Sequence, residues 1–477
     1  MLFNSFIFAI FLPIVFFLYW ITKKNLLLQN ALLLLSSYFF YACWDYRFLS
    51  LLIFSTLLDY YSGLKIHSAT NLDTKKIWFW ISIGINLGFL CVFKYYNFFI
   101  ESFTDVLSAI GVKANFSTLN VLLPVGISFY TFHGLSYVID IYKQRIQPER
   151  NFINYSVFVS FFPLLVAGPI ERATHLLPQI RQSRIFDSNK AIDGLRQILW
   201  GLFKKVVVAD NCAEYANIVF NNPADYSGST LALGAFFFAF QIYCDFSGYS
   251  DIALGTARLF GIELIRNFNF PYFSRDIAEF WRRWHISLST WFRDYLYIPI
   301  GGSKGGAWMK IRNTFIIFIV SGFWHGANWT FIIWGLLNAI YIIPSILFNT
   351  NRNNLDIVAQ NSILPTFKET LSILATFSLT VFAWIFFRAD SVSHACKYYS
   401  LLFSRSLFTI PEINPSMLLI AVGILVLIEW IGRKEQYAIA HFGLNWPKPL
   451  RWSFYYVITM SILYFAGSEQ QFIYFHF

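Results

Sequence analysis

The sequence predicts an all-α membrane protein that crosses the bilayer many times. Of its 477 residues, 57% are hydrophobic and only 13% are charged, against about 25% charged residues in an ordinary soluble domain. Mean hydropathy is +0.52. Apolar stretches of about 18 or more residues, each long enough to cross a hydrocarbon core about 30 Å thick, recur from end to end. Helices are the expected spanning elements, because lipid offers no water to satisfy open backbone groups.

The charge balance agrees with a membrane location. A formal charge of +10 at pH 7 comes from 36 Lys and Arg against 26 Asp and Glu. In a multi-span protein such an excess belongs in cytoplasmic loops, where it fixes topology and meets the headgroups of the lipid bilayer. We therefore expect no nucleic-acid partner. The five cysteines form no CxxC pair, which disfavours a disulfide framework or a zinc site.

The predicted spans follow one another along a single membrane-embedded domain, 1–477, with core motifs at roughly 121–343 and C-terminal helices at 371–477. The first apolar run has no basic n-region and no small-residue cleavage site, so we interpret it as a retained span rather than a signal peptide. Eleven or twelve spans are expected: 2–20, 26–43, 47–64, 77–95, 121–142, 153–168, 195–209, 231–249, 314–343, 371–387, 417–431 and 453–466.

Basic residues assign a side of the membrane to each loop. Lysines or arginines follow the first, third and fifth spans, whereas the loop near residues 44–46 has none. By the positive-inside rule, the N-terminus is extracytoplasmic and the basic loops are cytoplasmic. Residues 250–312 contain nine basic and five acidic side chains, so we expect this central stretch to face the cytoplasm as well.

The segment EFWRRWHISLSTWFRDYLYIPIGGSKGG, residues 279–306, is the most informative. Read as one helix, it places Trp281, Trp284 and Trp291 on one face and arginines on another, which is typical of a helix at the headgroup boundary. His285 lies beside the aromatic face, where a hydrogen bond between packed helices and a catalytic role are both open. The glycine-rich end, with Lys304, lacks the GxxxxGK[ST] spacing, so a turn is favoured over a phosphate-binding loop.

A second histidine lies in the apolar run NTFIIFIVSGFWHGANWTFIIWGLLNAIYII, residues 313–343. His325 is its only ionisable side chain among Asp, Glu, Lys, Arg and His. Such a group in an apolar run indicates a functional site. A neutral imidazole can accept a proton from a hydroxyl, so His325 is suited to general-base catalysis. The flanking Gly322 and Gly326 also fit close helix packing.

Two carboxylates, Asp245 and Asp251, lie among hydroxyl side chains in FQIYCDFSGYSDIALG, residues 240–255. Together with the two histidines they have the chemistry of a metal site. A polar hydrogen-bond network that braces the core or orients a histidine is the favoured interpretation, and we expect no metal.

The histidine segments resemble the two motifs of the membrane-bound O-acyltransferases: WRRWHISLSTWFRDYLYIPIGG contains His285, and FWHGANWTFIIWG contains His325. Similarity to the family's bacterial alginate O-acetyltransferase-like branch extends over nearly the whole chain. One departure is His476, where we expect Gln; it concerns the docking of a partner rather than catalysis. The further motifs are LPVGISFYTFHGLSYVIDIY, FFPLLVAGPIER, FQIYCDFSGYSDIALG, FAWIFFRA and the terminal FIYFHF.

The resemblance implies a helical enzyme that takes an acyl group from a cytoplasmic thioester, such as acetyl-CoA, without a bound cofactor. His325 corresponds to the catalytic histidine and His285 to the second motif histidine. We expect the two to share a cavity, although 40 positions separate them; transfer is either direct or through an acyl-imidazole. The residues expected to attract the donor's phosphates, with lipid headgroups as the alternative, are Arg282, Arg283, Arg293, Lys304, Lys310 and Arg312.

The resemblance also implies a multi-pass protein of the bacterial inner membrane that O-acetylates an extracytoplasmic polysaccharide together with an SGNH-type partner. The residues do not distinguish an alginate-like exopolysaccharide from peptidoglycan. D-alanyl transfer to teichoic acid is the alternative within the enzyme class. A secondary transporter is disfavoured because the chain shows no two related halves, and a scaffold would not require His325 in apolar surroundings.

Overall fold

The computed structural model describes the chain except for residues 114–115, 120–121, 468–469, 471 and 474–477. Every regular element in the described part is helical, with short 3-10 and π segments between some of the α-helices. The prediction of an all-α fold is therefore confirmed. The end of the terminal motif, including His476, lies outside the described residues.

The chain divides into two compact units. The first contains Met1–Ala191 and Thr256–Leu264, and the second contains Ile192–Gly255 and Ile265–Phe477. The two helices that contribute residues to both units are α10 (Ser188–Leu202) and α12 (Gly228–Leu259).

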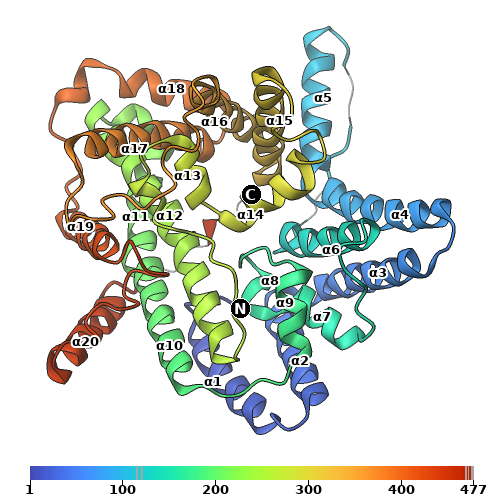
Figure 1. Ribbon diagram of the computed structural model, residues 1–477. Helices are drawn as coiled ribbons and strands as arrows, with labels where there is room; N and C mark the ends of the chain where they lie inside the picture. The colour runs from blue at the N-terminus through green and yellow to red at the C-terminus, as the bar shows by residue number, and fades with distance from the viewer. Residues whose placement is uncertain (114–115, 120–121, 468–469, 471, 474–477) are drawn as a thin grey trace. The chain divides into compact units, whose positions relative to one another are not determined.

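The first unit packs around the mutual contacts of α3, α4 and α6, which lie side by side, while α5 extends away from them (Figure 1). Most of α6 is buried, whereas α5 has no buried residue. Side-chain oxygens of Ser5, Asn25, Asn71 and Asn151 cap helices in this unit, as short polar residues do at N-termini. Its helices are α1 (Phe6–Ile21), α2 (Leu26–Asp45), α3 (Leu49–Ser68), α4 (Leu72–Leu90), α5 (Tyr96–Ala109), α6 (Ile127–Tyr142), α7 (Phe152–Ser160), α8 (Phe162–Leu165) and α9 (Ala173–Arg181).

One predicted span of this unit is interrupted. The run 153–168 is divided into α7 and α8 at Phe161, whose backbone is not helical (φ −53°, ψ 116°). Pro163 follows within the first turn of α8. Proline has no N–H to donate to the preceding turn and its ring clashes there, which favours a break at this point.

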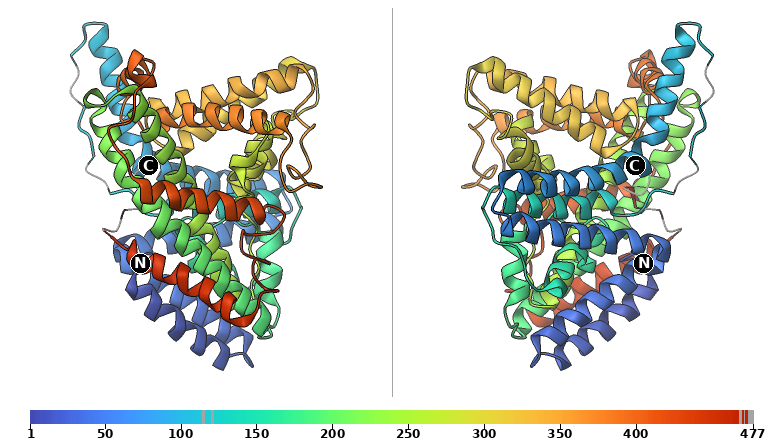
Figure 2. Two further views of the ribbon diagram at one scale, coloured as in Figure 1. Left: turned by 90° about the vertical axis from the view of Figure 1, so that its left-hand side faces the viewer. Right: turned by 90° about the vertical axis from the view of Figure 1, so that its right-hand side faces the viewer.

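The second unit contains the motif histidines. Within it, α15 and α16 pack against each other along their length, and α17 packs against α16. Figure 2 shows these gold and orange helices side by side. Its further elements are η3 (Phe203–Ala209), α11 (Asp210–Asn221), α13 (Ile277–Arg283), α14 (Ile286–Phe292), η6 (Arg293–Tyr297), α15 (Ala307–His325), α16 (Trp329–Leu347), α17 (Phe367–Arg388), α18 (Val392–Leu402), α19 (Ser416–Ile431) and α20 (Lys448–Tyr464).

The predicted single run 314–343 is wrong, because the structure breaks it into the end of α15 and the start of α16. The backbone is extended at Gly326, and Asn328 caps α16 by accepting a hydrogen bond from the Thr330 N–H at 3.0 Å. Glycine makes the packing of the pair possible, since a Cβ at Gly322 would lie 2.2 Å from the carbonyl oxygen of Phe331. The expectation of close packing at this glycine is confirmed.

The described helices include a set that suits a multi-pass membrane protein. Five are long and apolar enough to span a bilayer, and the shorter α1 and α19 are apolar as well. The number of spans, eleven or twelve, stays a prediction. The five are Leu26–Ser68, Leu72–Ala109, Gly228–Leu259, Trp329–Leu347 and Phe367–Arg388.

Candidate active site

His325 is the last residue of α15 and is only 3% exposed. Three aromatic rings surround its imidazole: Trp324 from the same helix, Trp334 from α16 and Phe387 from α17, with ring centroids at 4.9, 5.1 and 5.3 Å. These rings fix the plane of the imidazole and keep bulk water away from it.

His285 interrupts the helix that the sequence predicts over this segment. Its backbone is left-handed (φ 42°, ψ 54°), so α13 ends at Arg283 and α14 begins at Ile286. The prediction of one continuous helix with three aligned tryptophans is therefore wrong. The cause is a long-range contact, because the main-chain carbonyl of Asn267 accepts the Ile286 N–H at 2.9 Å and draws the chain out of helical geometry.

The imidazole of His285 is buried and lies within hydrogen-bond distance of the side-chain amide of Asn267. It is 1% exposed, and its Nδ1 is 3.0 Å from Oδ1 of Asn267. The ring also meets Phe246 edge-on at a centroid distance of 4.6 Å. Burial lowers the pKa of His285 to about 3, so the ring is neutral at physiological pH.

The two motif histidines have a common neighbour. The indole of Trp324 lies 6.1 Å from the ring of His285 and 4.9 Å from that of His325, measured between centroids. The fold thus brings both imidazoles against one side chain, despite the 40 residues between them. A cavity shared by the two rings stays a prediction.

Asp245 and Asp251 each pair with a buried lysine from η3. The Nζ of Lys205 is 2.8 Å from Asp245, and the Nζ of Lys204 is 2.6 Å from Asp251. Asp245 also accepts the Ile473 N–H at 2.7 Å, and Asp251 accepts a hydrogen bond from Gln197 at 2.8 Å. Within the described residues, no three His, Cys, Asp or Glu side chains gather as a metal site.

A small polar cavity lies next to these ion pairs. Its volume is about 20 Å³, enough for one water molecule. Charged groups of Lys204, Asp251, Arg266 and Glu429 line it together with the amide of Asn267. Tyr243 donates to Glu429 at 2.9 Å. The chain therefore gathers ionisable side chains beside the amide that contacts His285.

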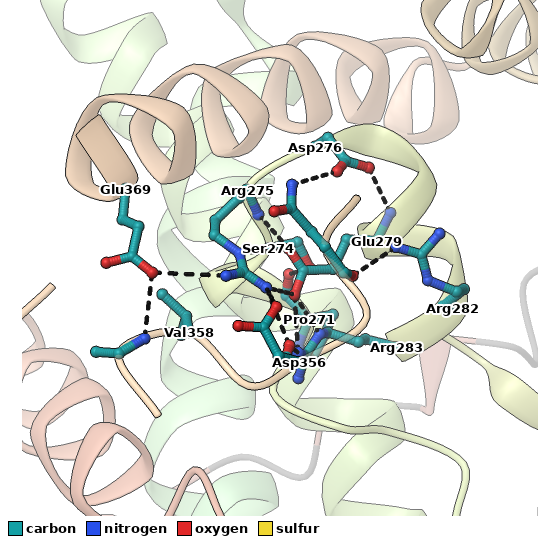
Figure 3. Close-up of polar contacts among 12 residues, drawn as sticks. Pro271, Ser274, Arg275, Asp276, Glu279, Arg282, Arg283, Asp356, Val358 and Glu369 are labelled. Atoms are coloured by element: carbon teal, nitrogen blue, oxygen red, sulfur yellow. Dashed lines mark hydrogen bonds and ion pairs between the residues drawn. The ribbon is translucent and has the colours of Figure 1, made fainter. Parts of the chain in front are cut away.

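The candidate donor-binding arginines of α13 are already engaged by the loop that follows α16 (Figure 3). Arg283 is 7% exposed, donates to the fully buried Glu279 at 2.8–3.0 Å and reaches the carbonyl of Asp356 at 3.0 Å. The exposed Arg282 donates to two carbonyls of the same loop, those of Asn351 and Asn354, at 2.7 and 2.8 Å. Both guanidinium groups fasten this loop to α13.

Three of the other candidate cations are exposed: Arg293, Lys304 and Arg312. Arg293 pairs with the adjacent Asp294 at 2.7 Å, and Arg312 donates to the carbonyl of Ile300 at 3.1 Å. The intervening segment is a turn, as expected, with positive φ at Gly301, Gly302 and Gly305. Lys310 is half-buried.

A comparison with known protein families assigns this chain to a family. The model of the membrane-bound O-acyltransferase family matches residues 143–386, about half of the chain, which include both motif histidines and both aspartates. This chain belongs to the membrane-bound O-acyltransferase family.

Relatives of this acyltransferase carry the names of O-acetyltransferases and of D-alanyltransferases. The probable alginate O-acetylase AlgI of Pseudomonas aeruginosa is 37% identical over 450 residues, covering 93% of this chain and 82% of that protein. The peptidoglycan O-acetyltransferase of Helicobacter pylori is 37% identical over 428 residues, covering 83% and 79%. The teichoic acid D-alanyltransferase of Bacillus subtilis is 26% identical over 288 residues, covering 58% and 71%.

Several residues of the acyltransferase site escaped sequence reasoning. The lysines at 204 and 205 are cations inside an apolar run, a signal that marks a partnered buried charge. Asn267 lies in RNFNFPYF, where nothing in the local pattern points to a histidine 18 residues later. The aromatic neighbours of His325 from α16 and α17 are invisible without the packing of three helices.

Proposed function

We propose that this acyltransferase moves an acetyl group from a cytoplasmic thioester, such as acetyl-CoA, across the inner membrane for O-acetylation of an extracytoplasmic polysaccharide. The observation that carries the proposal is the enclosure of His325, 3% exposed among three aromatic rings at the junction of α15, α16 and α17. Burying a polar imidazole costs free energy, and an ionisable side chain in an apolar membrane segment therefore supports a functional role.

In the proposed reaction, the neutral imidazole of His325 accepts the proton of the acceptor hydroxyl. The hydroxyl oxygen attacks the thioester carbonyl carbon, the C–S bond breaks, and the departing thiolate takes the proton back from the imidazolium. The dry aromatic walls serve this step by keeping water from competing with the hydroxyl for the acyl group. The chemistry needs no bound cofactor or metal.

The donor is proposed to approach from the cytoplasmic side, with the N-terminus of the chain on the opposite side. Support comes from Arg293, Lys304 and Arg312, which are exposed around the turn between η6 and α15. Guanidinium groups bind phosphate oxygens through paired N–H donors. Arg282 and Arg283 belong to the same proposed mouth, where their contacts with residues 349–366 hold its rim.

The acceptor is proposed to be an exopolysaccharide or peptidoglycan, reached through a separate SGNH-type protein outside the membrane. The names of the relatives at 37–38% identity support acetyl as the group that is transferred. The D-alanyltransferases match a smaller share of the chain at 26–28% identity, so D-alanyl transfer is the second candidate.

The experiment that tests the proposal replaces His325 by alanine in the cells that produce the polymer. We expect His325→Ala to abolish polymer O-acetylation while the protein remains folded in the membrane. Acetate and D-alanine released from the polymer by mild base are quantified together, which separates acetyl from D-alanyl transfer. An unchanged O-acetyl content with a normally inserted variant refutes the assignment of His325.

A matched pair of variants controls for loss of a buried imidazole in general. His325→Gln and His133→Gln make the same exchange at two buried histidines. The Nε2 of His133 accepts the Glu171 N–H at 3.1 Å, a contact that the glutamine oxygen can replace. We expect acetylation to survive in His133→Gln and to be lost in His325→Gln.

A further inference from the structure

Asn267 forms hydrogen bonds to the His285 turn from a buried position. It is 1% exposed and follows the long helix α12. Its Oδ1 meets three groups, the His285 Nδ1 at 3.0 Å, the Ser287 Oγ at 2.9 Å and the Ser287 main-chain N–H at 3.3 Å. Its amide nitrogen faces Ser250 at 3.4 Å.

The orientation of this amide follows from its partners. The main-chain N–H of Ser287 can only donate, so the atom that faces it must be the oxygen of Asn267. If the amide were turned over, its NH2 group would face the Ser287 N–H, and two donors would oppose each other. The same oxygen faces Nδ1 of His285, which must therefore carry the hydrogen. In a neutral ring, the lone pair is then on Nε2.

We propose that Asn267 is a positioning residue that locks His285 in the Nδ1–H tautomer, with Nε2 as its proton acceptor. The inference rests on the function proposed above and adds the protonation state of the second motif histidine. Asn267 binds the turn through two groups. Its side-chain oxygen contacts the ring of His285, and its main-chain carbonyl accepts the Ile286 N–H at 2.9 Å. Ring plane, tautomer and left-handed backbone thus depend on one residue.

The neutrality of the amide explains why asparagine serves better here than aspartate. A carboxylate at the same distance would accept the same Nδ1–H but would favour the imidazolium, which has no lone pair. The neutral amide orients the ring without protonating it. Asn267→Asp therefore keeps the hydrogen-bond acceptor and adds a charge, whereas Asn267→Leu removes the acceptor and keeps the branched shape and the number of side-chain heavy atoms.

The tautomer is measured directly by nuclear magnetic resonance on the full chain labelled with ¹³C and ¹⁵N histidine, with the His285 signals assigned by their absence in His285→Asn. We expect the wild-type ring to be in the Nδ1–H form and Asn267→Leu to lose that preference. Asn86→Leu is the matched control, since Asn86 is also 1% exposed, with side-chain bonds to Ser55 and Asp59 and none to a histidine. It should leave the His285 signals unchanged.

Acyl-transfer kinetics supply the second measurement. Asn267→Leu should lower kcat about 100-fold with little change in donor KM, which is the scale of a misplaced proton acceptor. Asn267→Asp should move the acidic limb of the kcat profile to higher pH, which a purely structural residue would not do. If Asn267→Leu does not fold, the wild-type tautomer and the Asn267→Asp profile still decide the matter.

Two results would overturn the inference. One is an Nε2–H tautomer of His285 in the wild type, and the other is a pH dependence of kcat that is the same in Asn267→Asp as in the wild type. The tautomer measurement requires no turnover. A failure of the proposed acetyl transfer is therefore distinguishable from a failure of the tautomer assignment.

Discussion

Lys205 provides the sharpest test of how the second unit is held together. Its Nζ lies 2.8 Å from Asp245 and 2.7 Å from Asp210, and Lys205 and Asp245 are 7% and 2% exposed. Lys205→Met keeps the length of the stem but leaves two carboxylates facing each other without a cation. Breaking a buried pair in this way costs about 3–5 kcal/mol, which corresponds to a fall of about 3–5 °C in the melting temperature of a chain of 477 residues.

The assay is thermal unfolding of the purified full chain, followed by the fluorescence of its 16 tryptophans. Lys190→Met is the matched control, because Lys190 and its partner Glu263 are 55% and 44% exposed at the side chain, and such a pair contributes about 1 kcal/mol or less. Lys205→Met combined with Asp245→Asn should recover part of the loss, since one uncompensated charge is removed with its partner. A melting temperature for Lys205→Met equal to that of Lys190→Met refutes the reasoning.

Three further predictions concern the mouth, a surface histidine and the α15–α16 pair. The exposed candidate donor contacts are Arg293, Lys304 and Arg312. Neutralising them two at a time should raise the apparent KM for the donor about tenfold at low salt, and high salt should erase the difference from wild type. If the KM for the donor is unchanged but the membrane topology of the variant is altered, these residues bind lipid headgroups instead. The hydrogen bond that His175 donates to the Glu171 carboxylate, at 2.8 Å, raises the pKa of this half-exposed imidazole. The stabilisation is therefore complete below the unfolded pKa of about 6.5 and disappears as pH rises through the folded value. Wild type should therefore melt higher than His175→Gln by about 1–3 °C at acid pH and by less at alkaline pH, and an advantage that grows with pH contradicts this sign. Gly322→Ala should cost about 1–3 kcal/mol of stability, because the new Cβ meets the Phe331 carbonyl, whereas Gly423→Ala in α19, with no atom within 4 Å of its Cβ, should be tolerated; equal yields of the two variants in folded form would speak against the packing argument.

Local pattern predicts part of this molecule and long-range contact decides the rest. Composition and apolar runs are sufficient for the helical membrane fold, and isolation in an apolar run makes His325 the candidate residue. The break at His285 was not predictable from periodicity, because the helical spacing of Trp281, Trp284 and Trp291 continues through it. What ends the helix is the carbonyl of Asn267, a residue in the irregular segment that follows α12.

The partners of the candidate donor-binding arginines were also only partly predictable from the sequence. A sequence gives the sign of a charge and its neighbours at helical spacing, so Glu279 four residues before Arg283 suggests an ion pair. It does not show that the loop after α16 returns to α13 and offers the carbonyl of Asp356 to that arginine. The partner of a long side chain is decided by the fold of segments far apart in sequence.

The left-handed backbone at His285 restricts how this position can change during evolution. At φ 42°, residues branched at Cβ are strained, whereas histidine, asparagine, aspartate and glycine are tolerated. Asparagine is one base change away from either histidine codon. A lineage that lost this imidazole could therefore keep the turn by passing to asparagine, and the active-site backbone would survive a change in its chemistry.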